Sequence, residues 1–272
     1  MKIYLVATVI LVSLTGCLQS MPTLQSLTAP KYSPSEIQAI NSIEFINEET
    51  LPENKHIEII GIAKGKYNTS YGSNQEMERE IKIHAYNLKG NAILPYTTVT
   101  DYISMTSTTV ITGTSQVVAY VEPEKNKILS DFATAEAGGL VSLSAARFAV
   151  NYPESAIIAK NIIERGNSSN INSEHIASAL NVLAKTKGRD SIDYFFDYIA
   201  NADKGNSYRA FTAITPYISN QDNEKLIRFM KFHESEQIKI ESAKLLIKFG
   251  ERKIVETYAE QTNNQLLFKL LI

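Results

Sequence analysis

The stretch SEHIASALNVLAKTKGRDSIDYFFDYIA, Ser173–Ala200, decides the fold of this chain of 272 residues. It contains two apolar stripes, one of Ile176, Ala179, Leu180 and Leu183 and one of Ile192, Phe195, Phe196 and Ile199. Both stripes have the i, i+3, i+4, i+7 spacing of a single helix face. Ser173 is a helix-capping residue before the first stripe, and Gly188 separates the two. The stretch therefore predicts two helices whose apolar faces pack together.

The same pattern recurs along the second half of the chain. Helical segments begin near Ser173, Ser207 and Ser235, and turns that start at Gly188 and Gly250 occupy matching places two units apart. A period of roughly 28 to 34 residues in helical pairs is similar to that of HEAT-type α-solenoid repeats. We therefore predict that residues 124–272 form an all-α, HEAT-like repeat domain, with LVSLSAARFAV and PESAIIAKNIIER as its first pair. A non-repetitive helical bundle is the alternative.

Residues 43–123 have a different pattern, which predicts a small α/β domain. A β-branched run in HIEIIGIAKGKY indicates a strand, and Ser73 opens a capping box for a helix that ends at Gly90. The segments AILPYTTVTDYISM and STTVITGTSQVVAYVE indicate two paired strands with a turn near Ser104 to Ser107. The expected order is β-α-β-β, and the whole chain is predicted to be α+β.

This element order carries a resemblance to a known domain. Together with Ala85, Gly90 and Asn91-Ala92-Ile93 at the helix-to-strand turn, it resembles a small α/β domain of bacterial envelope proteins, among them the lipoprotein sensor of the Rcs stress pathway. The resemblance implies a fold and not a function. Redox-dependent signalling is not implied, because that sensor is known for disulfides and this domain has no cysteine.

The N-terminus indicates export and lipid attachment. A lysine at position 2 precedes an apolar run of about 12 residues, which is typical of a signal peptide and too short to span a bilayer. The run ends in LTGC, which resembles the bacterial lipobox. The resemblance implies that residues 1–16 are removed and that Cys17 carries fatty acids such as palmitate, so that the mature protein is anchored to a membrane. An incidental cysteine after an ordinary signal is the alternative.

Residues 17–42 are expected to connect this anchor to the fold. Polar and small residues up to about Pro30 are typical of a flexible tether, and Ser33-Pro34-Ser35-Glu36 predicts the start of a short helix. Leu18 follows the cysteine where an aspartate would favour retention in the inner membrane of bacteria with two membranes. We therefore expect the outer membrane, with the protein facing the periplasm.

Composition indicates a globular body and excludes some partners. The formal net charge is −2, and nothing in the composition suggests the polybasic surface typical of a nucleic-acid-binding protein. The four histidines, His56, His84, His175 and His233, are scattered and are expected to be exposed or half-buried rather than metal ligands. The sequence contains no nucleophile elbow or phosphate-binding loop, so we predict neither a catalytic residue nor a metal or small-molecule cofactor.

An aromatic and acidic cluster is the candidate binding site. Tyr194 and Tyr198 are four residues apart, and Asp190, Asp193 and Asp197 are predicted on the same side, opposite Phe195 and Phe196. If second helices line a concave groove, these tyrosines face a protein partner. The alternative is that the tyrosines belong to the core and the aspartates to a solvated face.

These patterns predict a non-catalytic, membrane-anchored envelope lipoprotein that binds or scaffolds a partner protein of the envelope. Two alternatives stay open. One is an envelope hydrolase that acts on cell-wall material, which would need a convergent acid, base or nucleophile group, such as a cluster of perturbed carboxylates or a His-centred site in a deep pocket. The other is a stress-sensing lipoprotein, by resemblance.

Acylation of Cys17 is directly testable. We expect metabolic labelling with a fatty acid to mark the wild-type protein and to leave a Cys17→Ser variant unlabelled, because the thiol is the site of attachment. The variant should also leave the membrane fraction, since two or three acyl chains, at about 0.8 kcal/mol for each buried CH₂, provide the anchoring. Equal labelling of both proteins would exclude Cys17 as the anchor.

Overall fold

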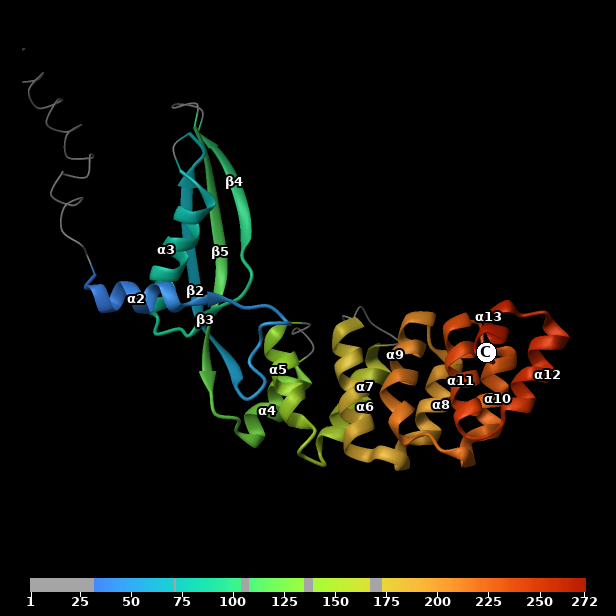
Figure 1. Ribbon diagram of the computed structural model, residues 1–272. Coiled ribbons are helices and arrows are strands. Elements are labelled where there is room, and N and C mark those ends of the chain that lie inside the picture. Colours follow the sequence, from blue (N-terminus) through green and yellow to red (C-terminus); the bar gives the residue numbers. More distant parts are fainter. Residues whose placement is uncertain (1–31, 71, 104–107, 135–138, 167–172) are drawn as a thin grey trace, which may run out of the picture.

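The computed structural model describes residues 32–70, 72–103, 108–134, 139–166 and 173–272. Within them the fold is α+β, as predicted: a five-stranded sheet precedes a long series of helices (Figure 1). The expected acylation site Cys17, the tether and the turn at 104–107 lie outside the described residues.

The first described helix begins where the sequence predicts. Helix α2, Pro34–Ser42, is capped by Ser33, whose hydroxyl accepts a hydrogen bond from the backbone N–H of Glu36. The Glu36 carboxylate in turn accepts from the backbone N–H of Ser33 at 2.7 Å. This reciprocal pair is a capping box, and Pro34 occupies the first helical position, where no N–H is needed.

The long strand β5 forms the centre of the sheet, and the long strand β2 pairs with it at one edge. The strands are β1 (Glu44–Phe45), β2 (His56–Asn68), β3 (Ala92–Ile93), β4 (Thr97–Ile103) and β5 (Thr108–Val121). Strand β5 pairs with β2 on one edge and with β3 and β4 on the other, and β1 pairs with β3 in parallel. The expected β-α-β-β order is present, with the two-residue strands β1 and β3 added to it.

Helix α3, Asn74–Asn87, covers one face of the sheet, and both of its predicted ends need correction. Ser73 precedes the helix, but its side chain makes no capping hydrogen bond. The left-handed residue after the helix is Lys89, with φ 61°, rather than Gly90. Gly90 serves close packing instead, because a Cβ there would lie 2.2 Å from Cγ1 of Val117.

The opposite face of the sheet is covered at one end by a helix from the second half of the chain. Helix α4 is Lys125–Ala133 and helix α5 is Leu140–Ala149. Leu140, Val141 and Leu143 of α5 pack against a buried cluster that includes Ile57 and Val118 of the sheet. The sheet and the helices therefore share a core across the segment, 122–124, that joins them.

The remaining chain consists of short helices. They are α6 (Ser155–Gly166), α7 (Ser173–Lys187), α8 (Ile192–Asn201), α9 (Lys204–Ile214), α10 (Asn223–Phe232), α11 (Glu236–Lys248), α12 (Arg252–Thr262) and α13 (Gln265–Lys269). Short 3₁₀ turns lie at Gly188–Ser191, Thr215–Tyr217 and Asn220–Asp222. Gly188 and Gly250, which the sequence placed in matching turns, both have positive φ, 53° and 91°.

The helices pair differently from the sequence prediction. The expected pairs were α5 with α6 and α7 with α8, but the close pairs are α4 with α5, α6 with α7, α8 with α9 and α10 with α11. Both of these predicted pairs are thus displaced by one helix, whereas α11 and α12, which the pattern also pairs, are in contact. Amphipathic stripes alone do not determine which neighbour a helix packs against. Each helix has an apolar face, and that face can pack equally well against the preceding or the following helix.

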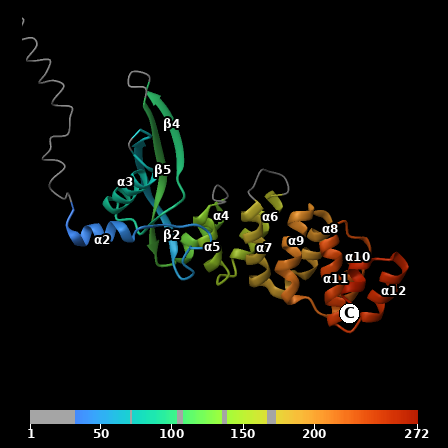
Figure 2. The same ribbon diagram turned by 45° about the horizontal axis from the view of Figure 1, so that its top comes forward.

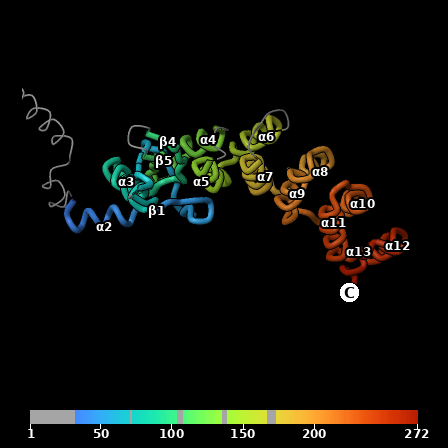
Figure 3. The backbone as a smooth tube through the Cα atoms, turned by 90° about the horizontal axis from the view of Figure 1, so that it is seen from above, coloured from blue at the N-terminus to red at the C-terminus, as the bar shows by residue number. Residues whose placement is uncertain are grey.

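These pairs arrange the helices in two rows (Figures 2 and 3). We call α5, α7, α9, α11 and α13 the inner row, since they lie on the inside of the curve that Figure 3 shows. Helices α4, α6, α8, α10 and α12 form the outer row. Inner-row helices contact one another in succession, α5 with α7, α7 with α9, α9 with α11 and α11 with α13.

Candidate protein-binding surfaces

The predicted aspartates lie on the exposed side of α8 and of the turn before it. Asp190, Asp193 and Asp197 are all exposed. Asp193 forms an ion pair with Lys225 of α10, whose ammonium also lies 5.0 Å from the centre of the Phe196 ring. Exposed pairs of this kind contribute little, about 0 to 1 kcal/mol. The predicted solvated face is therefore present at these three positions.

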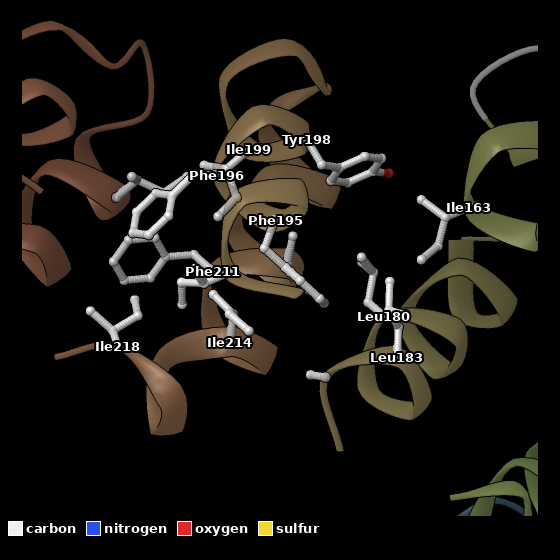
Figure 4. Packing of buried hydrophobic residues seen from close by; sticks show 14 of the residues in the cluster. Ile163, Leu180, Leu183, Phe195, Phe196, Tyr198, Ile199, Phe211, Ile214 and Ile218 are labelled. Atoms are coloured by element: carbon white, nitrogen blue, oxygen red, sulfur yellow. The ribbon is translucent and has the colours of Figure 1, made fainter. Parts of the chain in front are cut away.

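Tyr198 does not belong to that face. Its side chain is buried, with a relative exposure of 7 %, so the expectation that it points to a groove or to solvent is wrong. Figure 4 shows its ring directed toward the side of Ile163 on α6. Among the described residues its hydroxyl has no hydrogen-bond partner, and burial followed by the charge of Asp203 raises the pKa of Tyr198.

The burial follows from the position of α8 in the outer row, where α6, α7 and α10 surround it in addition to its close partner α9. Phe195 points toward Leu180 and Leu183 of α7 (Figure 4), and Phe196 packs at 5.4 Å between ring centres against Phe229 of α10. Tyr198 fills the remaining space toward α6. A helix flanked on three sides needs a wider apolar face than the stripe of four residues that the sequence indicates. The expectation that α8 lines the concave side is corrected as well.

Tyr194 is half-buried and stacks on Tyr198, with ring centres 6.4 Å apart. The ammonium of Lys160 on α6 lies 5.2 Å from the Tyr194 ring centre. Burial, then the nearby charge of Glu164, raises the pKa of Tyr194 to about 12. The two tyrosines thus join α8 to α6, and a role for Tyr194 in partner binding stays a prediction.

A buried polar cluster joins the sheet to the helices, and the sequence did not reveal it. His56, the first residue of β2, lies with Nδ1 2.9 Å from Oγ of Ser144 on α5 and with Nε2 2.7 Å from Oδ2 of Asp131 on α4. Ser144 Oγ also accepts the backbone N–H of Ile57 at 3.2 Å. Nearby, the guanidinium of Arg147 donates to the backbone carbonyl of Leu51 at 2.8 Å.

Ser144, His56 and Asp131 are the residue types of a hydrolytic triad, but the burial of Ser144 and His56 indicates a structural role and not a catalytic one. His56 and Ser144 are both fully buried, with no exposed surface. The Ser144 hydroxyl is already engaged by His56 and by the N–H of Ile57. A nucleophile must reach its substrate, whereas these groups are enclosed between β2, α4 and α5. We therefore assign the cluster to the junction.

The histidines were expected to be exposed or half-buried. This is wrong for His56 and His175, which are buried, and correct for His84 and His233. His175 is buried and its Nε2 lies 3.0 Å from the carbonyl oxygen of Phe132; burial lowers the pKa of His175. His233 is half-buried against the carbonyl of Ile199, and His84 is exposed. In the described residues no three His, Cys, Asp or Glu side chains gather as metal ligands would.

The inner row forms an extended surface with a groove near its first helices. The groove has a volume of ≈ 280 Å³ and lies between α5 and α7. Arg147, Ser178, Asn181 and Lys185 line it together with Glu48 and apolar atoms of Leu143 and Val150. Further along the row, Arg209 of α9 and Glu174 of α7 form an ion pair of 2.6 Å. The surface therefore combines charged, amide and apolar groups.

No helix in the described part of the chain has the length and apolar character needed to cross a membrane. No protein-family model, curated protein or solved structure matches the chain.

The position of Tyr198 gives a stability prediction. Replacement of a buried aromatic by alanine leaves a cavity, so we expect Tyr198→Ala to lower the free energy of unfolding by about 3 to 5 kcal/mol in urea denaturation. Tyr198→Phe keeps the ring and should stay close to the wild type. The exposed neighbour provides the control: Asp197→Ala should change stability by less than about 0.5 kcal/mol. A Tyr198→Ala variant as stable as this control would contradict the burial.

Proposed function

We propose that the chain is a membrane-anchored lipoprotein of the bacterial envelope that acts, without catalysis, as a protein-binding scaffold. In this proposal Cys17 carries the acyl chains and the protein faces the periplasm from the outer membrane. Helices within 124–272 act as HEAT-like repeats whose inner row holds an envelope protein. The partners are thus a membrane, through the acyl chains, and one protein; nucleic acid and small-molecule cofactors have no part in it.

The observation that carries this proposal is the inner row itself. Successive contacts from α5 to α13 produce one continuous surface on the inside of a curve (Figure 3). Curved stacks of helix pairs typically bind extended partners along this side. The repeat interpretation is supported further by the matching positive-φ turns at Gly188 and Gly250.

The side chains on this surface are suited to a protein partner. Asn181 and Lys185 are exposed on α7 beside apolar atoms of α5, and Lys244 and Lys248 are exposed on α11. Protein interfaces combine an apolar centre with a polar rim and about one hydrogen bond for every 100 to 200 Å². The groove between α5 and α7 offers such a centre, and the exposed amide and ammonium groups offer donors around it.

The rival function of a cell-wall hydrolase needs a nucleophile that substrate can reach. The one serine, histidine and aspartate cluster that we identify in the described residues is centred on His56, and its serine and histidine are enclosed. This favours the scaffold over the hydrolase. The stress-sensor alternative uses the same surfaces and differs only in what the bound partner does next.

A photo-crosslinking experiment tests the scaffold. A photoreactive amino acid at Asn181, in the inner-row groove, should give a covalent adduct with another protein in cells that make the lipidated chain. The same amino acid at Asp197, exposed on the outer row, is the matched control and should give little adduct. Lys185→Glu should reduce the Asn181 adduct several-fold, because it reverses a charge at the groove.

Two results would contradict the proposal. One is the absence of any protein adduct from Asn181 in a variant that is folded and membrane-bound. The other is release of soluble fragments from purified cell wall by the pure protein, with loss of that activity in Ser144→Ala at unchanged secondary structure, which would establish the hydrolase.

A further inference from the structure

The sheet has a second face that α5 covers only at one end. Alternation along β5 places Val117 toward α3 and Val118 toward α5, so Thr112, Thr114 and Gln116 share the side of Val118. Residues paired directly across antiparallel strands lie on the same face. We define the open sheet face by the residues of β2 and β4 that pair with these three: Ile62, Lys64, Lys66, Thr97 and Val99.

The open sheet face is apolar at its borders and positively charged along β2. Ile62 and Val99 have relative exposures of 61 % and 59 %, which are unusually high for large apolar side chains in a sheet. Lys64 and Lys66 are exposed, and in the described part of the chain neither ammonium forms an ion pair. The acidic residue that shares this side, Asp101, lies across β5 on β4, where it pairs with Val110.

Helices already pack on both faces of this sheet, so a helix is the element that we expect to pack on the open sheet face. Helix α3 lies along the opposite face through Met77, Ile81 and Ala85. Helix α5 lies on the same face as the open residues, against Ile57 and Val118. A helix on the open sheet face would continue the layer that α5 begins.

The first described residues of the chain lie on the other side of the sheet. Helix α2 packs on α3, and the ring of Tyr32 packs edge-on against Tyr86 of α3 with 6.2 Å between ring centres. Helix α3 in turn covers the face opposite Lys64 and Lys66. In the proposed lipoprotein the anchored end would therefore join the fold on the side away from the open sheet face, which favours a protein over a lipid surface there.

We infer that the open sheet face binds an amphipathic helix of a partner protein, with an apolar stripe against Ile62 and Val99 and with aspartates or glutamates toward Lys64 and Lys66. The small α/β unit is then a second binding site and does more than separate the inner row from the membrane. The inference rests on the proposed scaffold function and specifies the chemistry of a partner for the sheet.

Crosslinking at the exposed apolar positions tests this. In cells that make the lipidated full chain, a photoreactive amino acid at Ile62 or at Val99 should give an adduct with another protein. Ile157, an equally exposed isoleucine on α6 with 68 % relative exposure, is the matched control position. Mass spectrometry of the linked peptide should locate the link in a segment with an apolar stripe at i, i+3, i+4, i+7 flanked by acidic residues.

Charge reversal tests the electrostatic part. The double variant Lys64→Glu, Lys66→Glu should reduce the Ile62 adduct at least 5-fold, because like charges then face each other. Arg228→Glu with Lys253→Glu, on the outer-row helices α10 and α12, makes the same change in net charge and should leave the adduct unchanged. All four residues are exposed, so both variants should keep the wild-type thermal midpoint.

Four outcomes would overturn the inference. Three concern the partner: no adduct forms from Ile62 or Val99, the adduct is with a second copy of this chain, or the adduct is with lipid. In the fourth, the linked segment has no acidic residues and the adduct yield does not change in the charge-reversal variant. Its failure is distinguishable from failure of the scaffold. If Asn181 still yields a protein adduct while Ile62 and Val99 yield none, the inner row binds the partner and the small α/β unit only separates the inner row from the membrane.

Discussion

The hydrogen bonds of His56 are the interaction on which the arrangement of this molecule depends. One imidazole connects β2 to Asp131 of α4 and to Ser144 of α5; His56 and Ser144 are fully buried, and Asp131 is partly buried. A buried polar group without a partner costs about 1 to 3 kcal/mol, so the three residues stabilise one relative position of the sheet and the helices. Arg147 adds a second connection by donating to the carbonyl of Leu51.

A fixed junction has consequences for binding. The first helix of the inner row, α5, is also the helix that covers one end of the open sheet face. The groove beside Asn181 and the lysines of β2 are therefore presented by one body and at a set separation. If both are binding sites, as we propose, holding them in this way raises the effective concentration of a partner that spans both, provided that its length matches their distance.

Local chemistry made much of the fold predictable. The capping box at Ser33, the strands on either side of α3 and the apolar stripes of α7 and α8 each depend on residues close together in the sequence. Interactions over long distances were not predictable in the same way. Ser144 is 88 residues from His56, and no local pattern marks the pair. The displaced helix pairing has a similar cause, because a stripe such as that of α8 fits either neighbour.

The candidate site shows the same division. The exposure of Asp193 and Asp197 follows from their spacing against Phe195 and Phe196 on one helix. The burial of Tyr198 does not follow from the spacing, because it depends on α6 lying beside α8. Tyrosine is also equally suited to a core and to a surface. The open sheet face was missed since alternation in β2 is interrupted by the bulge between Ile59 and Gly61, which changes the side on which later residues point.

Native-state hydrogen exchange of the full chain tests the central claim, that the sheet and the first helices form one unit through His56, most directly. We expect peptides from β2 and from α4 and α5 to open with the same free energy, within about 0.5 kcal/mol. Ser144→Ala should lower that value for both by about 1 to 3 kcal/mol, because His56 Nδ1 and the Ile57 N–H lose their partner. Independent opening of β2 and α5, or an effect of Ser144→Ala confined to α5, would contradict the account.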